Sequence, residues 1–132
     1  MNVLIGKIEK VNSNDYMSII EMSANNELLK TIVIETPSTA PFLKTGNKIK
    51  IMFKETEVSL AKNFSGGISL QNKLKCNIKE IKKGKLLSNI LLDFKGIEIT
   101  SIITSSAVDQ LKLKTNDTVT ALIKTNEIII SP

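Results

Sequence analysis

The chain has 132 residues with 18 basic and 13 acidic side chains, a formal net charge of +5, and every basic residue is a lysine. It has no histidine and a single cysteine, Cys76, which excludes an internal disulfide, a cysteine metal cluster and a histidine-based catalytic triad. Without arginine, and with few, scattered aromatic residues, it lacks the usual guanine reader and base-stacking strip of a nucleic-acid-binding surface.

The chain begins with alternating apolar and polar residues. It contains neither the hydrophobic core of a signal peptide nor a run long enough to span a bilayer. We therefore expect a cytoplasmic protein that does not insert into a membrane. In that reducing compartment, Cys76 is expected to pack as a small core residue.

The first part of the chain has the period of β-strands. A turn without glycine is expected at residues 12–15, and two prolines limit residues 37–43 to no more than a turn or two of helix. The strands expected here are residues 3–8, 16–22 and 28–35, followed by a hairpin at 48–60. After it, residues 62–68 include Gly66 and Gly67 and are typical of a flexible joint.

The part after the joint shows the same order of elements. A step of three between Ile78 and Ile81 predicts a bulge, and residues 93–96 predict a tight hairpin. Residues 105–111 favour a short helix. The strands expected here are residues 73–78, 86–94 and 97–104, with a turn at 82–85 and a closing hairpin at 118–130.

These parallels reflect a duplication. At an offset of 70 residues, Leu43 falls over Leu113 and Phe53 over Ile123 without a gap. The sequence therefore divides into a first repeat, 1–61, a joint, 62–68, and a second repeat, 69–132. It predicts an all-β fold of two tandem OB-like five-stranded Greek-key barrels, each with one short helix. Such small halves are expected to share a core face, exchange strands or depend on another subunit.

Two stretches offer hydrogen-bond donors. Hydroxyl groups gather at the start of the expected helix, where they suit helix capping or, with a lysine, a tetrahedral oxyanion. The candidate lysine is Lys124, at the position that Lys54 holds in the first repeat. Residues 69–72 are either a polar linker or a second donor set on an extended segment.

At these stretches the second repeat resembles the molybdate-binding Mop family (molbindin, TOBE-type). Residues 69–72 resemble its Ser-x-Arg-Asn segment, residues 103–113 its Ile-Thr-x-x-Ser-Val-x-x-Leu-x-Leu stretch, and residues 121–124 its Ala-x-Ile-Lys strand. The first repeat is more divergent. Residues 57–61 followed by 67–69 resemble the joint in the paired Mop region that ends molybdate-transporter ATPase subunits, so the resemblance covers the whole chain as a tandem Mop protein.

The resemblance implies that amides, hydroxyls and the strand lysine surround molybdate or tungstate as a bound ligand, with no organic cofactor and often with groups from two subunits. Gln71 replaces the family's arginine and Ala107 its serine. At roughly 1.5–3 kcal/mol per hydrogen bond to a charged group, these losses weaken binding by about two orders of magnitude or more unless Ser105, Ser106 or another lysine substitutes. The residues implicated are Ser69, Leu70, Gln71, Asn72, Thr104, Ser105, Ser106, Ala107 and Lys124, with Lys54 and Ser38 as a possible second site.

The leading hypothesis is a non-enzymatic protein that binds the oxyanion for storage, buffering or sensing in molybdenum homeostasis, as a dimer or trimer with sites between subunits. The alternative is a regulatory or assembly module for a molybdate transporter or transcription factor, with weak or no ion binding. Nucleic-acid binding by the barrel face is a third interpretation, which predicts a steep dependence on salt. An enzyme is disfavoured because no histidine, cysteine pair or opposed carboxylates offers a mechanism.

Overall fold

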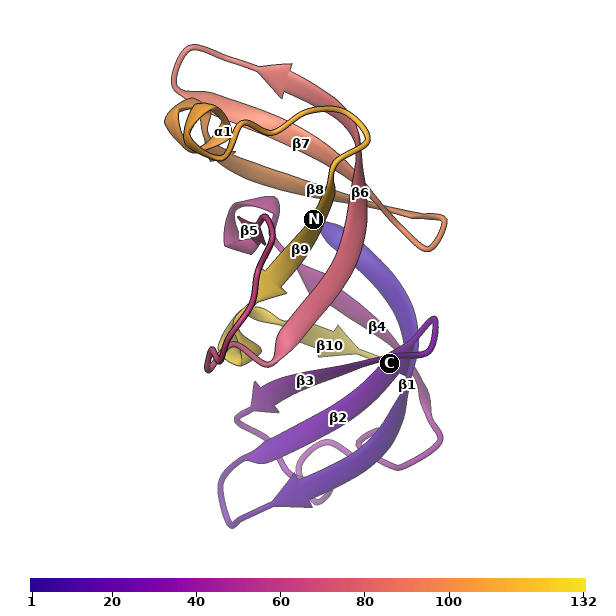
Figure 1. The fold of residues 1–132 in the computed structure, drawn as a ribbon. Coiled ribbons are helices and arrows are strands. Elements are labelled where there is room, and N and C mark those ends of the chain that lie inside the picture. The colour runs from indigo at the N-terminus through magenta and orange to yellow at the C-terminus, as the bar shows by residue number, and fades with distance from the viewer.

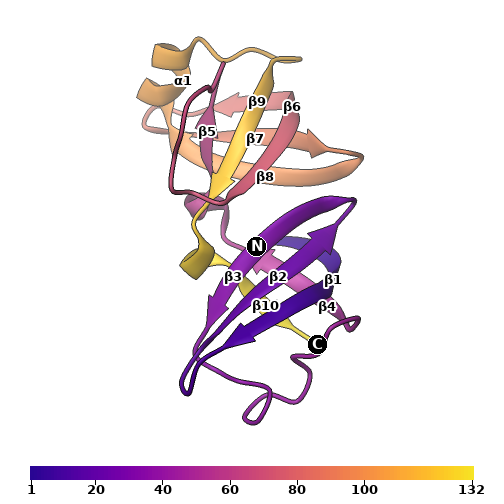
Figure 2. The same ribbon diagram turned by 60° about the horizontal axis from the view of Figure 1, so that its bottom comes forward.

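The computed structural model describes residues 1–132 and contains two curled antiparallel sheets, one beyond the other (Figures 1 and 2). The strand order of the first sheet is β10 (Ile129–Ser131), β4 (Lys48–Phe53), β1 (Asn2–Ser13), β2 (Ser18–Ala24) and β3 (Glu27–Val33). The order of the second sheet is β5 (Ser59–Ala61), β9 (Thr118–Ile123), β6 (Asn72–Lys83), β7 (Leu87–Phe94) and β8 (Ile97–Thr104). The predicted all-β class with two five-stranded units is confirmed.

The last strand of each repeat belongs to the other sheet. β5 pairs with β9, with Ser59 opposite Leu122, and β10 pairs with β4, with Ile129 opposite Met52. The predicted hairpins at 48–60 and 118–130 are therefore wrong. In their place, the short 3-10 turns η1 (Glu55–Glu57) and η2 (Thr125–Glu127) lead the chain across to the opposite barrel. The two repeats exchange strands, so neither repeat of the sequence coincides with a barrel in space.

The bulge and the tight hairpin form where they were predicted. Pairing of β6 with β7 skips a residue between Ile78 and Glu80, and the same skip occurs in β1. In the turn between β7 and β8, Lys95 and Gly96 both have positive φ, at 49° and 89°. This is the conformation that matches the twist of a two-residue hairpin.

The short helix is present only in the second barrel. α1 (Ser105–Leu111) ends at Lys112, whose left-handed backbone lets its amide donate to the carbonyls of Val108 and Asp109. The matching stretch of the first repeat forms turns, in which the amide of Ala40 donates to the carbonyl of Thr36. The prediction of one short helix per barrel thus needs correction for the first. No helix in the structure has the length and apolar character that crossing a membrane requires.

One continuous apolar core runs through both barrels. Cys76 is part of it, at 2% exposure, as predicted. Burial, followed by the nearby Asp93 carboxylate, raises the pKa of its thiol to about 12. The equivalent position of the first repeat is Gly6, where an added Cβ would lie 2.6 Å from the carbonyl oxygen of Ser23. At this position β1 therefore has no room for a side chain, whereas β6 holds the thiol of Cys76.

Two buried asparagines link the barrels where β1 and β6 begin, a region we call the waist. The side chain of Asn72 donates to the Lys30 carbonyl over 2.9 Å and accepts from the Lys30 amide over 2.7 Å. Asn2 makes the same pair of bonds to Thr100, at 2.9 and 2.8 Å. Each asparagine side chain makes the pair of hydrogen bonds that a neighbouring strand would make, but to a strand of the other barrel. These bonds therefore position the barrels against each other.

Candidate oxyanion site

The predicted site residues lie at two opposite ends of the second barrel. Asn72, at the start of β6, pairs with Ile123, whereas Lys83, at its end, pairs with Ser88 beside α1. The 12 residues of β6 separate the two ends by on the order of 30 Å along the strand. Figure 1 shows α1 at the far end and the start of β6 at the waist. The waist group is Ser69, Leu70, Gln71 and Lys124, and the helix group is Thr104, Ser105, Ser106 and Ala107.

The waist group holds unused donors. None of the hydrogen bonds in the structure starts from the main-chain amides of Ser69, Leu70 or Gln71. Lys124 is exposed, follows Ile123 and makes no ion pair. Because Ile123 is the cross-strand partner of Asn72, Lys124 leaves its strand beside the segment that carries the free amides. Free N–H groups next to an ammonium are a donor set suited to an anion.

The joint that leads to the waist group is fastened to the second barrel. The Lys62 ammonium donates to the Lys112 carbonyl over 3.0 Å and lies 3.1 Å from the Asp117 carboxylate. Bonds from the Lys114 amide and from Lys62 hold the pKa of Asp117 below its usual value. These contacts fix where the chain turns back toward residues 69–71.

Asn72 does not belong to this donor set. Its side chain is fully buried and uses both its donor and its acceptor on Lys30. The prediction that Asn72 binds the oxyanion is therefore not supported by its geometry, because it would first have to release the contact between the barrels.

The helix group is partly committed to structure. The Ser105 hydroxyl is buried, where it donates to the Gly84 carbonyl over 2.7 Å and lies 2.8 Å from the Ser88 hydroxyl. Thr104 caps α1, accepting from the Ala107 amide over 3.1 Å. The capping interpretation thus describes Thr104, whereas the Ser105 hydroxyl ties the start of α1 to the turn before β7. Only the Thr104 O–H, which remains a donor, and the exposed Ser106 stay available to a ligand.

The possible second site in the first repeat is not assembled within the chain. Lys54 follows Phe53, which pairs with Asn2 at the waist, whereas Ser38 lies in the turns beyond β3 at the opposite end of the barrel. Ile34 and Glu35 occupy the positions equivalent to Thr104 and Ser105. An apolar side chain and a carboxylate replace the two hydroxyls there, and a carboxylate repels an anion.

Lys73 is a candidate that the sequence reasoning missed. Side chains alternate along β6, so the buried Asn72 places Gln71 and Lys73 on the same outer face. Lys73 is exposed, makes no ion pair, and its ammonium lies 6.0 Å from the centre of the Phe64 ring. The alternation was visible in the sequence, but only the register of β6 shows which face carries Lys73.

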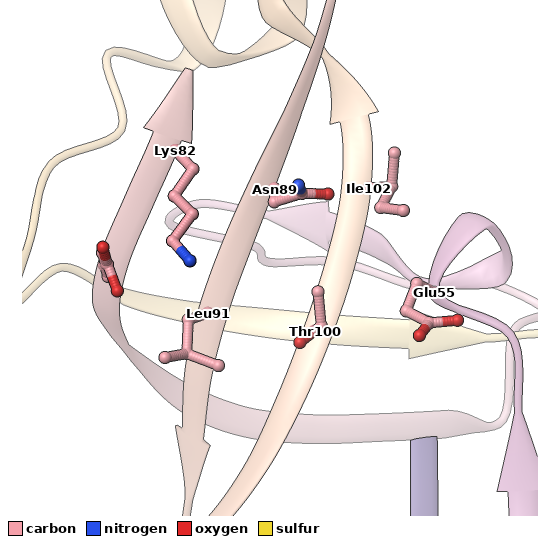
Figure 3. A pocket seen from close by; sticks show the side chains of 7 residues that line it. Glu55, Lys82, Asn89, Leu91, Thr100 and Ile102 are labelled. Carbon is pink, nitrogen blue, oxygen red and sulfur yellow. The ribbon is translucent and has the colours of Figure 1, made fainter. Parts of the chain in front are cut away.

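A hollow in the surface coincides with neither group (Figure 3). It measures about 300 Å³ and contains none of the predicted site residues. The N-terminal ammonium, 2.7 Å from Glu55, lowers the pKa of this carboxyl, so the pocket carries a charged acid that opposes an anion. No group of three or more acidic, cysteine or histidine side chains is placed to hold a metal ion. The pocket lining is Glu55, Glu80, Lys82, Asn89, Leu91, Thr100 and Ile102.

Comparison with known proteins gives a consistent result. The TOBE domain family matches residues 68–130. Molybdenum-pterin-binding protein 1 of Clostridium pasteurianum is 36% identical over 64 residues, which cover 48% of this chain and 94% of that protein. The molybdenum import ATP-binding protein ModC of Brucella abortus (strain 2308) is 30% identical over 83 residues, or 62% of this chain. The match spans only 23% of the length of that ModC protein.

A solved structure resembles the chain over nearly its whole length. It is a crystal structure of the cytoplasmic molybdate-binding protein ModG with molybdate bound, at 26% sequence identity and a TM-score of 0.92. The match covers 98% of this chain and 94% of that one. The tandem arrangement of two OB-like barrels is therefore shared by the two proteins.

Proposed function

The chain belongs to the molbindin family of TOBE-type domains, and from this we infer that it binds molybdate or tungstate in the cytoplasm, for storage, buffering or sensing. The observation that carries this function is the set of unused amides at residues 69–71 beside the unpaired Lys124. A tetrahedral dianion would accept from these donors through its oxygens. No metal ligand of the protein is needed for this kind of binding.

The site is completed between two copies of the chain. The waist group and the helix group lie at opposite ends of one barrel, so one chain cannot bring both to a single ion. A second copy would supply the missing hydroxyls from its Thr104 and Ser106. Placed against the waist group of the first copy, with Ser69, Gln71 and Lys124, they would complete the set of donors around the ion. The functional unit is accordingly a homo-oligomer, a dimer or a trimer.

Lys73 takes over the charge of the missing arginine. Gln71 offers no cation, but Lys73 stands on the same face of the strand, two residues further along. A lysine supplies a point charge without the planar fork of a guanidinium. Binding is therefore expected to keep its electrostatic attraction while losing bidentate geometry.

A second function is supported by the similarity to ModC, an ATP-binding protein of molybdenum import. A chain that shares part of its sequence with such a protein can associate with a transporter and regulate it. Pull-down of a molybdate transporter ATPase with and without molybdate separates the two functions. A complex that forms equally in both conditions favours the regulatory one.

Titration calorimetry tests the main proposal. Molybdate and tungstate are each expected to release heat and to raise the melting temperature, because both are tetrahedral dianions that fit the same donors. Sulfate is the control for charge alone, since it has the same charge and a smaller radius. Absence of heat and of a thermal shift with both molybdate and tungstate would refute oxyanion binding.

A further inference from the structure

We propose that the two barrels form two different contacts between copies of this chain: the second holds the oxyanion, and the first is an apolar contact that forms without any ion. This inference rests on the proposed function, because the oxyanion site needs the waist of one copy to meet the far end of another. We call that far end, where β1 meets β2 or β6 meets β7, the tip of a barrel.

The waist of the first barrel is apolar on its outer face. Met1, Val3 and Ile129 are 55%, 45% and 49% exposed. Met52 lies between the last two, opposite Val3 in one ladder and opposite Ile129 in the other, so they form one patch. The four residues at these positions in the second barrel are Gln71, Lys73, Ser59 and Leu122, so three of the four are polar.

The tip of the first barrel is apolar as well. Ile19 and Ile32 face each other across β2 and β3, at 41% and 37% exposure, and Ile34 just beyond them is 85% exposed. Met17 extends the patch. In the second barrel, Asn89 replaces Ile19 and Thr104 replaces Ile34, although Leu86 and Leu87 keep an apolar edge there.

The first barrel is apolar at both ends. The second barrel has a polar waist, and at its tip Asn89 and Thr104 interrupt the apolar edge of Leu86 and Leu87. If the oxyanion joins the tip of the second barrel in one copy to its waist in the next, the internal repeat places the apolar tip of the first barrel against its apolar waist in the equivalent contact. Contiguous exposed apolar patches on a small protein mark such contacts.

The distribution of charge supports the same division. Residues 1–61 hold seven lysines and seven acidic residues, whereas residues 62–132 hold eleven lysines and six acidic residues. The whole positive excess therefore lies in the part of the chain that carries the oxyanion donors. The first barrel keeps Lys54 at its waist, but Ile34 and Glu35 replace the hydroxyls of Thr104 and Ser105 at its tip, so we expect one oxyanion at such a contact per chain and not two.

Sedimentation analysis with and without molybdate, together with calorimetry, tests this division. The wild-type protein is expected to have the same oligomeric mass in both conditions and to bind one oxyanion per chain. I34E is expected to reduce the mass toward the 14.5 kDa of one chain without molybdate, because it places a carboxylate in the apolar contact. V3E, on the opposing patch, should do the same, and L28E, an exposed apolar residue outside both patches, is the matched control.

K124A separates the two contacts, because this variant should no longer bind the oxyanion but should keep the oligomeric mass of the wild type. Assembly of the wild type only on addition of molybdate, an unchanged mass for both I34E and V3E, or two ions per chain would each overturn the inference. A wild-type oligomer that binds no oxyanion and is dissociated by I34E would instead refute the proposed function and leave the apolar contact standing.

Discussion

The two barrels are alike inside and different outside. Leu4 and Leu74, or Ile20 and Ile90, occupy the same core positions 70 residues apart. On the outer face, in contrast, Val3 stands where Lys73 stands, and Ile34 where Thr104 stands. The comparison teaches that a duplicated fold keeps its core positions apolar, even where the side chain changes as from Phe53 to Ile123, whereas each surface is free to take its own ligand or partner.

The strongest test of the shared interior is to remove each asparagine at the waist. N72A and N2A each remove two hydrogen bonds and leave a buried amide and carbonyl without partners. We expect each variant to lose about 3 kcal/mol of unfolding free energy, measured by urea denaturation. Near-equal losses follow from the symmetry of the two contacts. A loss confined to one variant would show that only one asparagine holds the barrels together.

The next test addresses the difference between the outer faces. K124A is expected to weaken molybdate binding by about 2–3 kcal/mol, roughly 30- to 150-fold in Kd, because it removes an unpaired cation from the strand end beside the free amides. K54A, at the equivalent position of the first repeat, should leave the affinity unchanged. Both lysines are exposed, so neither change should alter the urea midpoint. Equal effects of the two variants on Kd would place the site elsewhere.

The sequence contained the local features of both barrels. The bulge followed from the step between Ile78 and Ile81, and the hairpin turn from Lys95 and Gly96, because these signals lie within a few residues of their effect. An exchange of strands was one of three arrangements expected for such small halves, but that β5 and β10 are the strands exchanged could not be predicted. Each has only three residues, and nothing in such a short strand tells whether β4 or β9 is its partner.

The candidate site rests on a resemblance and stays a prediction. The resemblance pointed to Lys124 and residues 69–71, and the structure leaves the amides of residues 69–71 without a partner. Asn72 was included as the last residue of the Ser-x-Arg-Asn segment, and Ser105 as one of the hydroxyls at the start of the expected helix. Their actual partners are Lys30 and Gly84, 42 and 21 residues away, and sequence spacing does not reveal such contacts.

A smaller effect is expected from Lys73, which distinguishes the polar waist from the apolar one. K73A should weaken molybdate binding about tenfold, since it removes one flexible cation from the edge of the donor set. K75A is the matched control, because Lys75 lies on the same face one step further from the waist. If K75A weakens binding as much as K73A, the effect is one of general charge and Lys73 does not replace the missing arginine.

The smallest effect concerns Cys76, whose place in the first barrel is taken by Gly6. The pKa of its thiol is raised from 9.0 to about 12, so the folded state keeps the proton that an unfolded chain releases. The contribution of Cys76 to stability is therefore present below pH 9 and is lost as the pH rises from about 9 toward 12, by up to about 1.4 kcal/mol per pH unit.

Comparing the pH dependence of unfolding in wild type and C76A between pH 8 and 10 isolates the contribution of the thiol, because all lysines are common to both. The wild type should lose about 1 kcal/mol more than C76A over this interval. Parallel curves would mean that the thiol ionises as easily in the folded barrel as in water. This is not expected of a side chain buried in the core.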